Sequence, residues 1–169
     1  QHEMETNFFG AVRMIAEVMP HFRQTNSGHI INISSLGGSV ALPYNSTYSS
    51  SKAALEAMSE SLSYELRGSG IHVSIVSPLG LKIENESPNL QYVKSEKSWN
   101  VHSFEMFSKM KSVVKPSVTK TIVAKRIDYI ISRKNPKLKY YVGMGSRFIV
   151  LLHDVLPFKL FKQIIQKTV

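Results

Sequence analysis

Apolar residues recur along this chain in two patterns, one with helical spacing and one in short β-branched runs. Positions three or four residues apart predict helices at about residues 8–19, 48–67 and 118–131, and two more apolar helical segments from 148 on, split by Pro157. Runs rich in Ile, Val and Tyr predict buried strands at 29–34 and 71–76 and a last short strand at 139–142. The order strand, helix, strand predicts a βαβ unit, and therefore an α/β fold with a parallel sheet covered by helices.

Several residues indicate where these helices start and stop. Pro20 is expected to close the first helix, and Gly68 and Gly70 are expected to end the second. Ser117 is the expected N-cap of the third helix, because a serine oxygen accepts a hydrogen bond from a free N–H of the first turn. Residues 79–115 show no clear period, and a loop of that length is typical of a lid or a binding segment.

The composition fits one soluble domain and excludes several kinds of chemistry. The chain has 169 residues, 43% of them hydrophobic, which is enough for one domain with its own core. It has no cysteine, so disulfides, thiolate chemistry and cysteine-ligated metals are excluded, and we expect no metal site. No signal-peptide pattern is present, and the longest apolar stretch, 148–152, is five residues. We therefore expect an intracellular, cytoplasmic chain that begins in mid-fold.

The net charge of +9 is divided unevenly between two halves of the chain. Residues 1–80 carry four basic and six acidic residues, a net −2, whereas residues 81–169 carry 17 basic and six acidic residues, a net +11. A basic half suggests nucleic acid, an anionic membrane surface or an acidic small molecule as a partner. Lysine dominates and its positions are scattered, which argues against nucleic acid, because such surfaces interleave arginine with aromatic residues.

Tyr48 and Lys52 form a candidate pair for proton transfer. They are four residues apart on a predicted helix, so both side chains project from one face. A phenol with a pKa of about 10 is a poor base at neutral pH, and a nearby cation lowers that pKa. Lowering the pKa by ~2–3 units needs roughly 3–4 kcal/mol, which one lysine and a second positive charge in a partly dry site could supply. With seven tyrosines and 15 lysines in the chain, roughly 0.6 such pairs are expected by chance, so the pair alone indicates nothing.

Ser35 makes the pair more specific. It directly follows the predicted strand at 29–34, thirteen residues before Tyr48. The carboxyl edge of a parallel sheet is where open α/β folds bind ligands. A serine at that edge can hold a carbonyl oxygen while Tyr48 delivers or removes its proton. A helix cap or a turn serine is the alternative interpretation.

Four segments, in this order and spacing, together resemble the catalytic half of the short-chain dehydrogenase/reductase family. They are Asn7-Phe-Phe-Gly10, Asn32-Ile-Ser-Ser35, Tyr48-Ser-Ser-Ser-Lys52 and Ser77-Pro-Leu-Gly80. The resemblance covers residues 1 to about 85, and residues 116–145 more loosely. It implies a Rossmann-type, doubly wound parallel sheet and reversible hydride transfer between NAD or NADP and an alcohol or carbonyl substrate. It also implies a homo-oligomer.

The resemblance assigns a role to each matching residue. Tyr48 would be the general acid and base, and Ser35 would bind the reacting oxygen of the substrate. Lys52 would lower the Tyr48 pKa and hold the nicotinamide ribose, while Asn7 would position a water in a proton relay behind Lys52. The alternative for Asn7 is an ordinary residue of a helix N-terminus.

Further cofactor contacts would come from Tyr48 and from the turn that contains Pro78 and Gly80. This turn departs from the family pattern, because Leu79 stands between them and Ile83 occupies the place of a clamping threonine. The glycine-rich turn that holds the dinucleotide phosphates is also missing. Gly143-Met-Gly145 lacks a third glycine and leads into no βαβ unit. We therefore expect one partial domain without its N-terminal nucleotide-binding βαβ units, either a fragment or a degenerate protein.

Four regions of this partial domain are expected to differ in their tasks. They are the catalytic core at 1–80, a substrate loop at 81–115, a last helix and strand at 116–145, and an amphipathic C-terminal tail at 146–169. The tail is expected to cover an apolar pocket or pack on a partner subunit, with peripheral contact to an anionic membrane as the alternative. Its apolar residues suggest a lipophilic substrate of the steroid, retinoid or fatty type. The rival function is a non-catalytic binding or membrane-docking protein on a truncated scaffold.

Overall fold

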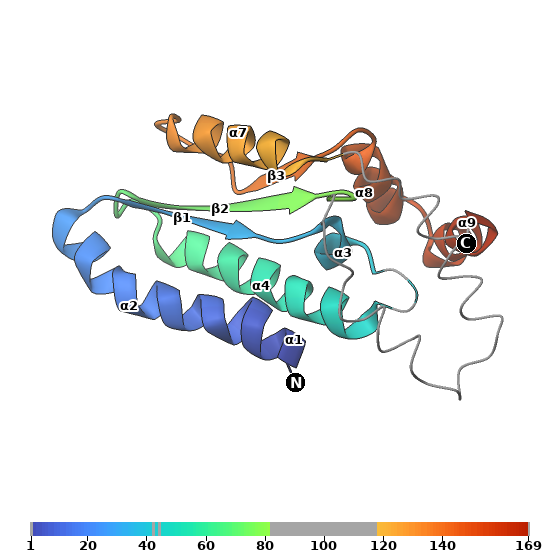
Figure 1. Cartoon of the computed structure of the whole chain (residues 1–169), viewed down its shortest axis with the longest axis horizontal. Coiled ribbons are helices and arrows are strands. Elements are labelled where there is room, and N and C mark those ends of the chain that lie inside the picture. Colours follow the sequence, from blue (N-terminus) through green and yellow to red (C-terminus); the bar gives the residue numbers. More distant parts are fainter. Residues whose placement is uncertain (1, 42, 44, 82–117, 169) are drawn as a thin grey trace.

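Three parallel strands form the centre of the molecule in the computed structural model, which describes residues 2–41, 43, 45–81 and 118–168 (Figure 1). The strands are β1 (Gly28–Ile33), β2 (Ile71–Pro78) and β3 (Lys139–Val142), in the spatial order β1–β2–β3. Ile31 is paired with Ser74, and Val76 with Tyr140. Because the strands run the same way, their carboxyl ends meet at one edge of the sheet.

Helices cover both faces of this sheet, as Figure 1 shows. One face carries α2 (Gly10–Thr25) and α4 (Ser46–Glu65), and the other carries α7 (Lys120–Ile131). The remaining helical elements are α1 (His2–Met4), the π-helix η1 (Glu5–Phe9), α3 (Leu36–Ser39), α8 (Ser146–Val155) and α9 (Phe158–Thr168). The chain therefore has the predicted α/β, Rossmann-type architecture, and each predicted strand is present within two residues of its expected bounds.

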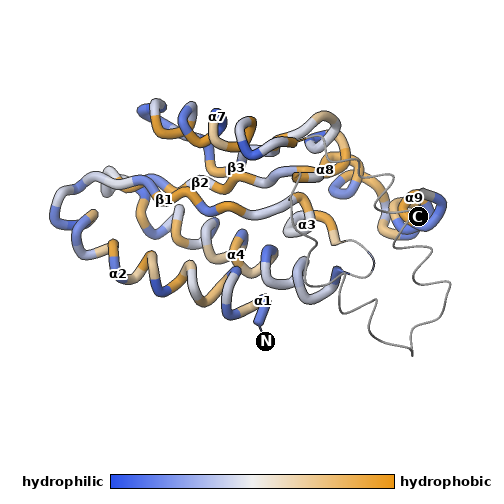
Figure 2. The backbone as a smooth tube through the Cα atoms, in the orientation of Figure 1, coloured by the Kyte–Doolittle hydropathy of each residue, from blue (hydrophilic) through white to orange (hydrophobic). Residues whose placement is uncertain are grey.

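Three apolar clusters hold the layers together, and Figure 2 shows hydrophobic residues concentrated along the strands. The cluster between α7 and the sheet contains Val76, Val118, Val123, Ile130, Tyr140 and Val142. The cluster beneath α2 and α4 contains Met19, Ile30, Leu66, Ile71 and Val73. The third cluster joins α3 to the C-terminal helices through Leu36, Val40, Val150 and Phe161. Burial of these side chains on both faces explains why the strands are continuous apolar runs.

The first helix does not close at Pro20, so that prediction is wrong. α2 contains Pro20 and continues to Thr25, where Asn26 adopts a left-handed conformation with φ of 48° and ends it. Proline has a helical φ and removes only one intrahelical hydrogen bond, so favourable packing can carry a helix past it. Phe22, two residues beyond, packs against the cluster beneath α2.

The turn between α4 and β2 agrees with the prediction that glycines end this helix. Both Gly68 and Gly70 have positive φ, 83° and 77°. A Cβ on Gly70 would lie 2.1 Å from the carbonyl oxygen of Asn26. Only glycine therefore fits where this turn passes the end of α2.

The expected N-cap Ser117 lies outside the described residues, and the structure caps α7 with a different side chain. α7 begins at Lys120, and the Thr119 side chain accepts a hydrogen bond from the Ile122 N–H. Val118, expected in the helix, instead forms a parallel bridge with Leu81. Apart from Leu81, the substrate loop expected at 81–115 lies outside the described residues.

The face that α4 buries is not the apolar face that its sequence suggests. Helical spacing places Ala54, Met58, Leu62 and Leu66 on one side, but only Leu66 of these is fully buried. The fully buried side chains within α4 are Ser49, Ser51, Leu55, Glu56 and Ser59. The helix that carries the candidate pair therefore packs through a largely polar face, and its polar groups must find hydrogen-bond partners inside the protein.

Candidate active site

The candidate residues meet at the carboxyl edge of the sheet. Ser35 follows β1, while Tyr48 and Lys52 lie in the first two turns of α4, which begins beside α3 at that edge (Figure 1). Pro78 is the last residue of β2. A strand end, a short helix and the start of a long helix thus bring together residues that are up to 43 positions apart in the sequence.

Tyr48 is half-buried, and its ring lies close to the Ser35 hydroxyl, since a Cβ on Gly37 would be 3.5 Å from Tyr48 Cε1 and 3.6 Å from Ser35 Oγ. Burial raises the pKa of Tyr48, the Ser35 hydroxyl opposes that rise, and the negative charge of Glu3 adds to it. In the chain by itself the net direction is upward, and the lowering of the Tyr48 pKa expected from Lys52 together with a second positive charge stays a prediction. The phenol is therefore protonated at neutral pH and is ready to act as an acid.

Lys52 extends back along α4 toward the end of β1. Its Nζ donates a hydrogen bond of 2.9 Å to the Ile33 carbonyl oxygen and lies 5.9 Å from the centroid of the Tyr48 ring. Burial lowers the pKa of Lys52, and the carboxylates of Glu3 and Glu56 oppose that effect. The ammonium is thus held over the tyrosine ring by a backbone carbonyl.

Ser35 is a helix cap, which was the alternative considered for it, while its binding of a substrate oxygen stays a prediction. It is the N-cap of α3, where its Oγ accepts a hydrogen bond of 3.2 Å from the Gly37 N–H. The same side chain reaches the Tyr48 phenol. The cap therefore fixes the position of the hydroxyl beside the tyrosine.

Asn7 lies in the π-helix η1 and contacts α4, not Lys52 itself. Its Nδ2 donates to Glu3 Oε2 at 2.8 Å and to Ser51 Oγ at 3.0 Å. Ser51 in turn donates a hydrogen bond of 2.7 Å to the carbonyl oxygen of Tyr48. Asn7 thus contacts Ser51, the neighbour of Lys52 in the sequence. Its role in a water relay stays a prediction. π-turns inside helices often occur at functional sites.

The turn after β2 is fixed by backbone hydrogen bonds. The Leu79 N–H donates to the Val142 carbonyl at 2.8 Å, and Gly80, with φ of 62°, accepts from the Val118 N–H at 3.3 Å. Pro78 pairs with Val142 in the sheet. The backbone that was expected to contact a cofactor is therefore hydrogen-bonded to Val142 and Val118, and Ile83 lies outside the described residues.

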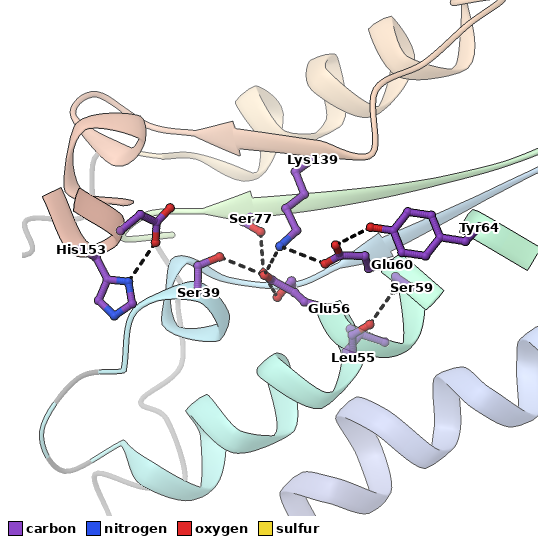
Figure 3. Close-up of polar contacts among 11 residues, drawn as sticks. Ser39, Leu55, Glu56, Ser59, Glu60, Tyr64, Ser77, Lys139 and His153 are labelled. Atoms are coloured by element: carbon purple, nitrogen blue, oxygen red, sulfur yellow. Dashed lines mark hydrogen bonds and ion pairs between the residues drawn. The ribbon is translucent and has the colours of Figure 1, made fainter. Parts of the chain in front are cut away.

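A buried carboxylate, Glu56, also belongs to this region and was not among the predicted site residues. It accepts hydrogen bonds from Ser34, Ser39 and Ser77 and pairs with Lys139 (Figure 3). The signal that could have found it is the spacing of Tyr48, Lys52 and Glu56, three chemically active residues repeated every four positions along one helix face.

Two kinds of feature are absent from the part of the chain that the structure describes. Its His, Asp and Glu side chains form no group of three that could hold a metal ion. None of the helices in the described ranges combines the length and the apolar character needed to cross a bilayer.

Comparison with known proteins agrees with this geometry. The family model for short chain dehydrogenases matches residues 1–91. The "Uncharacterized oxidoreductase YusZ" of Bacillus subtilis (strain 168) is 30% identical over 172 residues, which cover 99% of this chain. A 3-ketodihydrosphingosine reductase of Bacteroides thetaiotaomicron is 47% identical over 76 residues, which cover 45% of this chain and 28% of that protein.

Solved structures show the same fold. A short-chain dehydrogenase from Streptomyces avermitilis matches with a TM-score of 0.73 and 26% identity, covering 89% of this chain and 54% of the other. The chain spans 61% of the length of YusZ, so it corresponds to part of the length of these relatives. From the family match over more than half of its residues and the shared fold, we conclude that the chain belongs to the short-chain dehydrogenase/reductase family.

Proposed function

We propose that the protein is an NAD(P)-dependent oxidoreductase that transfers a hydride between the cofactor and an alcohol or carbonyl substrate. The observation that carries this proposal is the contact of the Ser35 hydroxyl with the Tyr48 phenol, with the Lys52 ammonium 5.9 Å from the centre of the same ring. A proton donor, an oxygen-binding hydroxyl and a fixed cation at the carboxyl edge of a parallel sheet are what acid–base catalysis at a carbonyl requires.

The residues present fit the nicotinamide-ribose end of NAD(P). A lysine ammonium has three donors, and within the described residues the Ile33 carbonyl takes one of those of Lys52. The remaining donors suit ribose hydroxyls, and Tyr48 lies on the same helix face. The sequence holds no Gly-x-Gly-x-x-Gly pattern, so it offers no match for the glycine-rich turn that would bind the phosphates of the cofactor.

In the direction of carbonyl reduction, the chain supplies the proton and holds the substrate. Ser35 donates a hydrogen bond to the carbonyl oxygen, and the Tyr48 O–H gives that oxygen its proton as the C=O π bond breaks. NAD(P)H, when bound, supplies the hydride that forms the new C–H bond, so the substrate is reduced and the cofactor is oxidised. Lys52 stabilises the phenolate left on Tyr48. In the reverse direction the phenolate removes the hydroxyl proton.

We further propose a lipophilic substrate. One relative is a 3-ketodihydrosphingosine reductase, whose name describes a ketone with a long apolar chain. A cavity of about 370 Å³ lies between the segment after α3 and the last two helices. Its lining combines apolar side chains with a few polar ones: Ala41, Pro43, His153, Phe158, Phe161, Lys162, Ile165 and Gln166. Such a lining suits an apolar chain whose polar end faces Lys162 or His153.

Peripheral membrane contact is a second candidate function, supported by the exposed side of α8. Met144, Phe148, Leu151 and Val155 lie on one face of this segment, with exposed fractions between 58% and 91%. Arg147 lies beside them, and Lys159, Lys162 and Lys167 follow on α9. Exposed apolar residues with basic neighbours are typical of helices that lie in an anionic membrane interface.

A label-transfer assay tests the oxidoreductase proposal. The full-length protein is incubated with NADPH or NADH carrying deuterium at C4, and with ketones and aldehydes of increasing chain length. We expect deuterium on the carbinol carbon of the product, with higher kcat/KM for the longer, more apolar substrates. If neither cofactor transfers deuterium to any substrate of the series, the proposed function is wrong. The alternative, a non-catalytic binding or membrane-docking protein, then replaces it.

A further inference from the structure

Glu56 is a carboxylate buried two turns after Tyr48 on α4, with only 4% of its surface exposed. Its Oε1 accepts hydrogen bonds of 2.7 Å from Ser34 and 2.9 Å from Ser77. Its Oε2 accepts one of 2.9 Å from Ser39 and lies 3.4 Å from the Lys139 ammonium. Figure 3 shows Ser39, Ser77 and Lys139 pointing toward this carboxylate from three different elements.

The donors around Glu56 satisfy a charge that would otherwise be costly to bury. An ionised carboxylate accepts about four hydrogen bonds, and three hydroxyls and one ammonium are available here. A buried ion pair contributes little net stability compared with an apolar replacement, whereas removing one partner alone is strongly destabilising. Stability is therefore a weak explanation for this carboxylate, and the positions of its partners are more informative.

Each of the three serine partners lies next to a part of the candidate active site. Ser34 directly precedes Ser35, and Ser77 directly precedes Pro78. Ser39 is the last residue of α3, the short helix that Ser35 caps. Glu56 itself is on the helix that carries Tyr48 and Lys52. One carboxylate thus ties the ends of β1 and β2 and the far end of α3 to the helix that bears the proton-transfer pair.

The packing around this carboxylate leaves little freedom for α3 to shift. A Cβ on Gly38 would lie 2.8 Å from Ser34 Oγ, 3.0 Å from Glu56 Oε1 and 3.1 Å from the backbone carbon of Lys52. Glycine at this position lets α3 approach α4 closely enough for Ser39 to reach Glu56. The cap residue Ser35 is therefore held from both sides of the turn that contains it.

The charge of Glu56 also acts on Lys52, one turn closer to the site. Its carboxylate raises the pKa of the Lys52 ammonium, against the lowering caused by burial and alongside the effect of Glu3. The hydrogen bonds of Glu56 thus affect the position of Ser35, and its negative charge affects the pKa of Lys52.

We propose that Glu56 is a positioning residue that holds the Ser35 hydroxyl against the Tyr48 phenol by fixing the ends of β1 and β2 and the helix α3 to α4. The catalytic part of this inference rests on the proposed oxidoreductase function, whereas the positioning of Ser35 at Tyr48 is independent of it. The variant Glu56→Gln is nearly isosteric, removes the charge, and places N–H donors where hydroxyl donors already point.

The first test is the titration of Tyr48 in the full-length protein. NMR of ring-labelled tyrosine monitors it, and the Tyr48 signal is identified by its absence in Tyr48→Phe. Because the Ser35 hydrogen bond lowers the pKa of Tyr48, its loss in Glu56→Gln raises that pKa. The matched control is Glu60→Gln, since Glu60 lies 3.9 Å from the same Lys139 ammonium and contacts none of the serines at the strand ends. An unmoved Tyr48 titration in folded Glu56→Gln overturns the inference whether or not the protein is an enzyme.

The second test uses the label-transfer assay. A displacement on the order of 1 Å costs about 100-fold in rate, so we expect Glu56→Gln to lower kcat by ~10–100-fold and leave cofactor affinity within about two-fold of wild type. For carbonyl reduction, the alkaline limb of the kcat profile moves to higher pH, because the proton donor Tyr48 has the raised pKa that the first test measures. A merely structural role would lower the folded fraction and leave the profile in place.

Two outcomes separate this inference from the proposed function. If the wild type transfers hydride and folded Glu56→Gln has wild-type kcat and pH profile, the positioning role is wrong and the function stands. If the wild type transfers no hydride, the function is wrong, and the tyrosine titration alone decides the role of Glu56. Should Glu56→Gln fail to fold, Ser34→Ala removes a single donor, and we expect it to raise the Tyr48 pKa in the same direction. An unmoved Tyr48 titration in folded Ser34→Ala overturns the inference.

Discussion

The carboxyl edge of the sheet and the C-terminal helices organise polar and apolar groups in opposite ways. At the sheet edge, a carboxylate and several serines are buried, and the hydroxyls of Ser34, Ser39 and Ser77 all donate to Glu56. In α8 and α9, large apolar side chains face solvent, and the nearby charges are mostly basic. Hydrogen bonds hold the residues of the first region in position, whereas the second region exposes an apolar surface. This difference fits a rigid site for proton transfer beside a region that contacts lipophilic molecules.

Removing the cation from the sheet edge should have the largest effect of the changes to these two regions. In Lys52→Met the phenolate of Tyr48 loses its stabilising charge, and we expect kcat/KM to fall roughly 100–1,000-fold, the equivalent of 2–3 pKa units. Label transfer from deuterated cofactor measures this. Lys159→Met in the tail is the matched control and should stay near the wild-type rate. Equal losses of kcat/KM in Lys52→Met and Lys159→Met would show that proton transfer does not depend on the sheet edge more than on the tail.

The tail should depend on one buried anchor more than on its exposed aromatic residues. Phe161 is 6% exposed and packs with Leu36, Val40 and Val150, whereas Phe158 is 77% exposed. We expect Phe161→Ala to lower the free energy of unfolding by about 3 kcal/mol, and Phe158→Ala to change it by less than about 0.5 kcal/mol. Denaturant unfolding of both variants measures the contrast. Similar values would mean that α9 does not pack as a folded part of the core.

The exposed face of α8 should matter for lipid contact and not for folding. In the double variant Phe148→Ser, Leu151→Ser we expect binding to vesicles of phosphatidylserine and phosphatidylcholine to fall about tenfold, because apolar area that enters the interface is lost. Unfolding free energy should stay near that of the wild type. Wild-type protein that does not sediment with these vesicles would refute the membrane contact and leave α8 as cover for the substrate region.

A smaller effect is expected at the opposite edge of the sheet, where His29 and His72 face each other across β1 and β2. The ring centroids are 6.0 Å apart, and His29 Nε2 donates to Ser74 Oγ at 3.0 Å, since that hydroxyl donates to the Lys137 carbonyl. Burial and then His72 lower the pKa of His29 below 6.5.

The folded state therefore binds fewer protons at His29 than the unfolded state in mildly acidic solution. The stability from neutral His29 is present above pH 6.5 and is lost as pH falls through the lowered pKa. We expect His29→Gln to flatten the pH dependence of unfolding in this window, measured by denaturant titration. An unchanged slope would show that His29 titrates alike in both states.

The sequence predicted the sheet and the candidate pair because both depend on local pattern. The strand at 139–142 has the predicted bounds, and Tyr48 and Lys52 share a helix face as their spacing requires. Helix ends were less predictable. Pro20 and Ser117 carry ordinary stop and start signals, but packing of Phe22 and capping by Thr119 decided the boundaries instead.

The polar interior of α4 could not be predicted from periodicity. Ser49, Ser51 and Ser59 are buried, yet serine adds no apolar signal to a helical pattern. Glu56 is buried because donors from the residue after β1 and from α3, β2 and β3 converge on it, and that convergence exists only after the chain has folded. The burial that raises the Tyr48 pKa could not be predicted from spacing either, because burial depends on tertiary contacts.

Hydride transfer by Tyr48→Phe in the full-length protein tests the central claim most directly. Tyr64, on the same helix and exposed to solvent, provides the matched control Tyr64→Phe. If Tyr48 is the proton donor and acceptor beside Ser35 and Lys52, its variant loses ~1,000-fold or more in label transfer while cofactor affinity and the control stay near wild type. A Tyr48→Phe variant that transfers the label within about tenfold of the wild-type rate would contradict the account.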